Sequence, residues 1–120
     1  MNKLSNLKRV PYSKLEQAMG HVFFEPIKIG DITISIQAST HHYCSPRKSK
    51  SIVTNEILEA KDYSAFEIEL SRNGQVINPN DPCLSKGSWS KYWTSADVAG
   101  YVPRADVEAM IADLEASFGT

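Results

Sequence analysis

The sequence predicts an α+β domain in which a small antiparallel sheet of two hairpins packs against an amphipathic helix. Two stretches, 26–37 and 65–77, alternate apolar and polar residues around a two-residue turn, as hairpin strands do. A third stretch, 104–118, instead repeats its apolar residues at helical spacing. Together they indicate a sheet of four to five strands with a short helix near the N-terminus and a longer one at the C-terminus.

The first hairpin is "PIKIGDITISIQ", residues 26–37, with Gly30-Asp31 as its turn. A two-residue loop pairs Ile29 with Ile32, and it therefore pairs Ile27 with Ile34. Both pairs fall on the same face, so the apolar pattern and the turn agree. The expected ribbon has one buried face and one solvated face.

The second hairpin is "AFEIELSRNGQVI", residues 65–77, and Asn73-Gly74 is a strong signal for its turn. The register pairs Leu70 with Ile77 and places Phe66, Ile68 and Leu70 on the buried face. Glu67 and Glu69 point the other way and are expected in solvent. A further strand is expected from 51–58 or from the "VAGYVP" stretch, although helix and strand are hard to separate in 51–58.

Two helices complete the fold. Ser13 and Glu16 have capping-box spacing, and Gly20 ends the short helix that they begin. Pro103 opens the last helix and Gly119 closes it. Its buried stripe is expected to be Val107, Met110, Ile111, Leu114 and Phe118. Residues 1–10 are polar and expected to be loose, which leaves 11–120 as a single domain.

Composition limits the partners. The chain has 120 residues, with 13 basic against 14 acidic residues and a net charge of −1. Strong binding to duplex nucleic acid is therefore not expected, and an electrostatic partner must meet a local patch. No apolar run approaches the roughly 18 residues of a membrane span, and the first 14 residues are too polar for a signal peptide. We expect a cytoplasmic protein with reduced thiols, with a Cys44–Cys83 disulfide as the alternative.

The segment "HHYCSPRKSK", residues 41–50, is the candidate binding loop. Arg47, Lys48 and Lys50 place three positive charges within four residues, and Tyr43 offers a ring for stacking. A second loop, 87–97, adds Trp89 and Trp93. An anionic, nucleotide-like ligand would suit a pocket between the two loops. The predicted ligand-binding set is His42, Tyr43, Ser45, Arg47, Lys48, Trp89 and Trp93.

Less specific interpretations stand beside this one. In one of them, the basic 41–50 loop is only solvated surface without a ligand. In another, at least one of the two tryptophans fills the edge of the core, with its N–H bonded to a carbonyl. Cys44 and His42 are two residues apart and share a strand face, which suits a thiol nucleophile and its base. Pro46 removes a backbone donor there, however, so an enzyme is not favoured. His21, His41, His42, Cys44 and Cys83 lack zinc-site spacing, and we expect neither a metal nor another cofactor.

The segments "HYCSPR", "YSAFEIEL" and "VAGYVPRADVEAMIADLE" together resemble a group of small bacteriophage and prophage accessory proteins. The likeness covers about residues 39–118, and the C-terminal stretch also resembles the tails of lambdoid-phage early accessory proteins. The resemblance implies a phage setting in the host cytoplasm and supplies no mechanism.

This setting suggests a non-enzymatic binding protein that counters a host defence or takes over a host function. It would bind an anionic ligand or a host protein through the 41–50 and 87–97 loops. The alternatives are a small hydrolase or transferase using Cys44 and His42, and a virion assembly factor. Self-pairing of sheet edges into a homodimer stays open.

Overall fold

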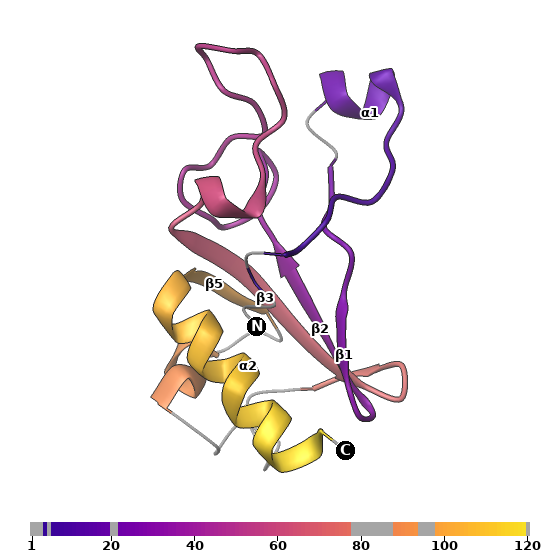
Figure 1. The fold of residues 1–120 in the computed structure, drawn as a ribbon, viewed down its shortest axis with the longest axis vertical. Helices are drawn as coiled ribbons and strands as arrows, with labels where there is room; N and C mark the ends of the chain where they lie inside the picture. The colour runs from indigo at the N-terminus through magenta and orange to yellow at the C-terminus, as the bar shows by residue number, and fades with distance from the viewer. Residues whose placement is uncertain (1–3, 5, 20–21, 78–87, 94–97, 120) are drawn as a thin grey trace.

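The computed structural model describes residues 4, 6–19, 22–77, 88–93 and 98–119. It shows an α+β fold, with a five-stranded antiparallel sheet, a short N-terminal helix and a longer C-terminal helix, as predicted. The C-terminal helix α2 (Arg104–Phe118) lies across one face of the sheet (Figure 1). Among the described residues, no helix has the length and apolar character needed to cross a membrane.

The first hairpin has the predicted register. Strands β1 (Ile27–Ile29) and β2 (Ile32–Gln37) pair Ile29 with Ile32 and Ile27 with Ile34. Gly30 has a φ of 59°, a left-handed conformation that glycine adopts at little cost. A Cβ at this glycine would also collide with the backbone carbonyl of Phe118 at the end of α2. The turn therefore needs glycine both for its backbone and for its packing.

The second hairpin joins β3 (Ala65–Arg72) to the short β4 (Gln75–Val76). Asn73 and Gly74 have φ angles of 52° and 82°, so both turn residues take the left-handed conformation of a type I′ turn. The Ile77 N–H donates to the Leu70 carbonyl at 2.8 Å, which confirms the predicted pairing.

Strand β3 is the centre of the sheet. It pairs with β2 on one edge, and with β4 and β5 (Val98–Pro103) on the other. Phe66 is opposite Val102 while Ile68 is opposite Ala99, so β5 carries one extra residue. This β-bulge places Tyr101 at a φ of 52°, outside the usual range for an aromatic residue.

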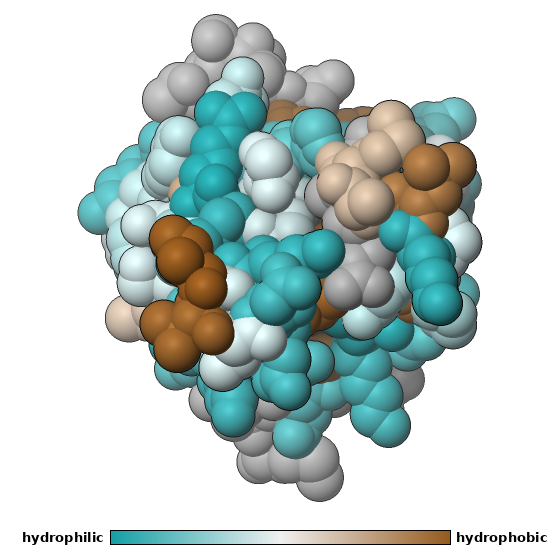
Figure 2. Space-filling view, turned by 90° about the horizontal axis from the view of Figure 1, so that it is seen from above, coloured by the Kyte–Doolittle hydropathy of each residue, from teal (hydrophilic) through white to brown (hydrophobic). Residues whose placement is uncertain are grey.

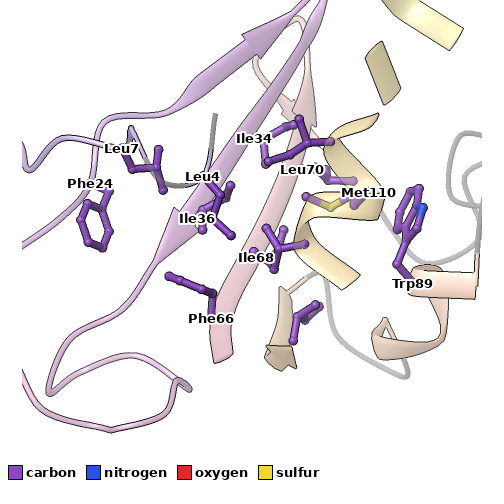
Figure 3. Packing of buried hydrophobic residues seen from close by; sticks show 14 of the residues in the cluster. Leu4, Leu7, Phe24, Ile34, Ile36, Phe66, Ile68, Leu70, Trp89 and Met110 are labelled. Atoms are coloured by element: carbon purple, nitrogen blue, oxygen red, sulfur yellow. The ribbon is translucent and has the colours of Figure 1, made fainter. Parts of the chain in front are cut away.

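The sheet and α2 share one hydrophobic core (Figure 3). Helix α2 contributes the predicted stripe to this core. Four of its residues are buried, namely Val107, Met110, Ile111 and Leu114, and Phe118 packs partly buried against the core. Leu4 and Leu7 also belong to the core, with 0% and 9% of their surface exposed. The N-terminal segment was expected to be loose because it is polar and basic. Two leucines in it nevertheless pack in the core, so residues 4 and 7 are held in place.

Residues 8–19 continue from the N-terminal segment, and we call them the arm. Its backbone pairs with the next segment, because Glu25 N–H donates to Lys8 and Val10 N–H donates to Phe23, each at 2.8 Å. Helix α1 (Lys14–Ala18) follows, and Ser13 and Glu16 form the predicted reciprocal capping bonds at 3.0 and 3.1 Å. The apolar side of α1 does not reach the core, since the helix lies away from the sheet (Figure 1). The predicted stop at Gly20 lies outside the described residues.

Candidate functional site

A long connection, residues 38–64, joins the neighbouring strands β2 and β3. Its one helical piece is the short 3-10 helix η1 (Ala60–Asp62). We call this connection the 38–64 loop. It projects from the end of the sheet that also carries α1, away from the β1–β2 turn (Figure 1). Ordered connections of this length with little secondary structure usually carry function.

Two arginines hold the base of the 38–64 loop through its backbone carbonyls. Arg9 donates to Leu58 O at 3.1 and 3.3 Å, and its guanidinium stacks on Phe24 at 3.9 Å from the ring centroid. Burial lowers the pKa of Arg9. Arg104, the first residue of α2, donates to Tyr63 O at 2.7 Å and also to Ala60 O. These charge-assisted bonds fix the base of the loop to the core.

His42 lies inside the 38–64 loop rather than on its surface. It is 9% exposed, and its Nδ1 lies 2.6 Å from Ser39 Oγ. Ser39 Oγ already accepts from the His41 N–H at 3.1 Å, so its own proton is available to Nδ1. Nε2 then faces Glu67 at 3.9 Å. Burial, together with the positive charges of Arg9, His41 and Arg47, lowers the pKa of His42 to about 4. The ring is therefore neutral at physiological pH and offers no positive charge to an anion.

Glu67 differs from its predicted position in solvent. Its side chain is 19% exposed beneath His42, and burial raises its pKa, an effect that Arg47 opposes. Ser39, His42 and Glu67 thus follow the order of a serine–histidine–acid relay. Ser39 is 0% exposed, however, and its hydroxyl is already hydrogen-bonded. This relay is a buried structural network, closed to a substrate.

The Cys44 thiol is likewise enclosed. It is 1% exposed and donates to the carbonyls of Ser39 and Pro46 at 3.2 and 3.4 Å. Burial raises its pKa, so the protonated and unreactive form predominates. His42 bonds to Ser39 instead of the thiol. The pairing that a thiol enzyme would need is therefore absent between these two residues, and Cys83 lies outside the described residues.

Tyr43 and Arg47 are on the surface, where a third residue joins them. The Arg47 guanidinium lies 5.0 Å from the Tyr43 ring centroid, and the Tyr43 and Tyr101 rings lie 5.9 Å apart. Tyr43 is 51% exposed and Tyr101 is 50% exposed. We call these three residues the ladder. It combines stacking surface with a planar cation.

The bulge in β5 builds the ladder. Its Tyr101 N–H donates to Tyr43 O at 2.9 Å, which fastens the loop to the strand. The neighbouring Gly100 leaves no room for a side chain, because a Cβ there would lie 2.9 Å from Tyr43 Cβ. Arg47 Nε donates to Thr40 O at 3.3 Å, and its terminal nitrogens have no hydrogen-bond partner among the described residues. Sequence analysis missed Tyr101, and the only signal for it was the Gly-Tyr step inside a predicted strand.

Ser45 and Lys48 contribute mainly through their backbones. Ser45 N–H donates to Ala65 O at 3.1 Å, and the Ser45 carbonyl accepts from Ser64 at 2.8 Å. The Lys48 carbonyl accepts the Tyr63 hydroxyl at 2.7 Å. The Ser45 side chain is exposed and that of Lys48 is half-buried, so both border the ladder without stacking on it.

Trp89 and Trp93 are separate from the ladder. They are 1% and 5% exposed and pack edge to face at 5.9 Å. Trp89 lies in the 3-10 helix η3 (Ser88–Tyr92) and donates to Asp113 of α2 at 2.8 Å, while Tyr92 donates to Asp106 at 2.5 Å. These two carboxylates hold η3 onto the helix. Both indoles are enclosed rather than open to a ligand. Residues 87 and 94–97 of the second loop lie outside the described residues, so the pocket predicted between the two loops stays a prediction.

Residues 51–55 of the 38–64 loop form a tight turn, where a strand was considered from the sequence. One backbone bridge, Lys50 to Ile57, is all that remains of the strand considered for 51–58. Ile52 and Val53 lie beyond it and are 88% and 92% exposed. We call this pair the tip. Figure 2 looks onto this end of the molecule and shows separate apolar areas between hydrophilic side chains.

Comparison with known protein families, curated proteins and solved structures gave no match. Within the described ranges, no three His, Cys, Asp or Glu side chains lie close enough together to hold a metal ion. His21 and Cys83, two of the residues considered as zinc ligands, lie outside those ranges.

Proposed function

We propose that this protein acts by binding, without turnover, and that its partner is a host protein in a phage-infected cell. The phage setting rests on the resemblance of the "HYCSPR" and "GYVP" segments. The binding surface is the end formed by the arm, the 38–64 loop and Tyr101, which we call the binding end.

One observation supports this proposal most strongly: exposed large hydrophobic side chains gather at one end. Of the ten in the described residues, nine belong to the arm, to Phe23 in the segment paired with it, to the 38–64 loop or to Tyr101. Only Val76 belongs to the opposite end, at the β3–β4 hairpin. The nine are Val10, Tyr12, Leu15, Met19, Phe23, Tyr43, Ile52, Val53 and Tyr101. Exposed apolar groups concentrated in this way are typical of protein interfaces, and tyrosine and arginine are typical of their hot spots.

The half-exposed rings of Tyr43 and Tyr101 favour a protein over a small molecule. Small ligands are usually held in a concave pocket that covers most of their surface. One described hollow of about 420 Å³ is lined by residues 6–8 and 25–28. Another, of about 350 Å³, is lined by residues 51, 54, 56–59, 61 and 62. Neither contains a ladder residue. A broad partner surface would cover the half-exposed rings more completely than a nucleotide would.

The second candidate is the anionic, nucleotide-like ligand. It is favoured by charge, because the stretch 32–55 contains no Asp or Glu but three cationic residues, Arg47, Lys48 and Lys50. Arg47 also has terminal nitrogens available for a phosphate. In this case the ladder would stack on the base and bind the phosphate.

Affinity capture from bacterial lysate followed by reconstitution tests the proposal. The captured protein is identified, purified and titrated against the wild type, a Tyr43→Ala/Arg47→Ala variant and a Val76→Ser control. We expect the double variant to weaken binding by about a hundredfold and the control to leave it unchanged. Equal affinity for all three would contradict the proposal.

Thermal melting with nucleotides and cyclic nucleotides tests the second candidate. A bound ligand raises the melting temperature by linkage, and Arg47→Ala should abolish the rise. A rise with one nucleotide that depends on Arg47, without a captured protein, would favour the small anion over the host protein.

A further inference from the structure

We infer that the tip, Ile52 with Val53, is a preformed apolar anchor that enters an apolar pocket on the protein partner. This inference rests on the proposed function and adds to it the chemistry of a second contact. The ladder supplies stacking and positive charge, whereas the tip supplies only hydrocarbon.

Within the part of the chain that the structure describes, nothing covers the two side chains of the tip. Ile52 and Val53 are 88% and 92% exposed, so they contribute almost nothing to the core. Turns normally carry polar residues or glycine at such positions. Both side chains are β-branched and have few rotamers, so fixing them on binding costs little entropy.

The backbone beneath the tip is hydrogen-bonded as a closed turn. Ser51 Oγ accepts from the N–H groups of Val53 and Thr54, each at 3.2 Å. The Ser51 carbonyl accepts from Asn55 at 2.9 Å, and Asn55 reverses the chain at a φ of 58°. Asparagine tolerates this left-handed conformation better than most residues. The tip is therefore held in one arrangement before any partner arrives, which reduces the cost of association.

The two segments that lead to and from the tip are also hydrogen-bonded to each other. Ser51 N–H donates to Glu56 O, and Leu58 N–H donates to Ser49 O, each at 2.9 Å. Ser49 Oγ in turn accepts from the Thr40 N–H at 2.9 Å, in the segment that also bonds Arg47. The tip and the ladder are thus parts of one braced loop, and one partner can contact both.

Charge around the tip favours a protein over a lipid surface. Lys48 and Lys50 precede the tip, while Glu56 and Glu59 follow it. An anionic membrane would attract the first side and repel the second, whereas a protein pocket can carry a rim of both signs. The two described hollows have charged rims, including Lys8 and Lys28 in one and Glu56 and Asp62 in the other. The first is also lined by Leu7, Pro26 and Ile27, so a second copy of the chain is tested separately below.

The test uses the full chain and the purified partner from the capture experiment. Ile52→Ser/Val53→Ser should weaken binding by about tenfold or more while leaving the melting temperature unchanged. Ser51→Ala keeps both apolar side chains but removes their brace, and we expect a smaller loss of about threefold. Val76→Ser, which removes an exposed apolar side chain at the opposite end, is the matched control and should have no effect.

The outcomes separate this inference from the proposed function. If the tip variant binds as tightly as the wild type while Tyr43→Ala/Arg47→Ala does not, the anchor is wrong and the proposed function stands. If wild type captures no partner, both are contradicted. Vesicles of equimolar phosphatidylcholine and phosphatidylglycerol are sedimented with each protein. If wild type sediments with them and the tip variant does not, the tip binds lipid and not a protein pocket. A wild-type dimer by light scattering that the tip variant makes monomeric would replace it with a second copy.

Discussion

At the residue scale, the chemically versatile side chains of the 41–50 segment divide into buried and exposed groups. His42 and Cys44 face inward and bond to Ser39, while Tyr43 and Arg47 face outward and stack. Burial alternates from His41 to Ser45 although residues 40–43 form turns and bends. The groups capable of covalent chemistry are therefore enclosed, and the groups left at the surface are the ones that the proposed function uses.

His42 should make stability depend on pH. Its pKa falls from 6.5 in the unfolded chain to about 4 in the fold, so the unfolded state binds more protons between these values. Stability is complete above pH 6.5 and decreases as pH falls toward 4. We expect a loss of about 2 kcal/mol between pH 7 and pH 5, measured by urea unfolding.

The control for this prediction is His42→Gln, which should flatten the pH dependence whatever its absolute stability. Glu67 on β3 faces the ring, and Arg9, His41 and Arg47 are the other charged or titratable groups that act on it. The raised pKa of Glu67 acts in the opposite sense, since it makes the fold less stable as pH rises through its titration. An unchanged pH profile in His42→Gln would refute the assignment.

Cys44 should resist thiol reagents. In a Cys83→Ser background, we expect a neutral disulfide reagent to label Cys44 at least about a hundredfold more slowly in the folded protein than in urea, because the thiol is enclosed and protonated. Labelling as fast as that of a free exposed cysteine would instead support the thiol-enzyme alternative.

At the element scale, the two hairpin glycines provide a matched comparison. Gly30 and Gly74 both have positive φ, but only Gly30 lies against another element, the end of α2. Gly74→Ala should cost about 1 kcal/mol, from the backbone conformation alone. Gly30→Ala should cost about 2–3 kcal/mol, because its Cβ also displaces the Phe118 carbonyl. Equal losses in urea unfolding would mean that α2 does not pack on this turn.

A substitution at Tyr101 in strand β5 should weaken partner binding while leaving the stability of the fold nearly unchanged. Tyr101 occupies a left-handed conformation that asparagine tolerates better, so Tyr101→Asn should leave the unfolding free energy within about 1 kcal/mol of wild type. The same change removes one ring of the ladder and should weaken partner binding by about tenfold. Loss of stability without loss of affinity would show that the strained residue serves the fold alone.

The hairpins and helices could be predicted from sequence because their signals are local. The turn at Asn73-Gly74 and the alternation around it fix one register, and the same holds for Gly30-Asp31. The stripe from Val107 to Leu114 and the capping pair Ser13–Glu16 are equally local. Each pattern needs only neighbouring residues to be consistent.

The candidate site was harder to predict because its geometry depends on contacts distant in sequence. Tyr43 and Arg47 were identified from composition, but the third ring, Tyr101, arrives through a bulge in a different strand. An aromatic residue in a polar stretch gives the same sequence pattern whether it is exposed or buried. The sequence therefore did not show that Trp89 is buried and donates a hydrogen bond to Asp113. The same holds for Leu4, which lies in the core although its neighbours are polar.

At the scale of the whole molecule, the two ends differ in character. The end with the β1–β2 turn and the C-terminus of α2 is built from regular elements around a closed core (Figure 1). The binding end consists of irregular chain tied down by Arg9, Arg104 and Tyr63, and it exposes most of the large apolar side chains. A stable body that presents a fixed, irregular surface suits recognition without turnover.

The claim that the binding end contacts a partner is tested most directly by a titration. The purified, captured partner is titrated with wild type, Tyr43→Ala/Arg47→Ala and Val76→Ser. Calorimetry should show that the ladder variant loses about a hundredfold in affinity while the hairpin control binds as wild type does. Matching far-UV and thermal unfolding curves for all three would show that the fold is intact. Full affinity in the ladder variant, or an equal loss in the control, would contradict the claim that this end of the molecule is the binding surface.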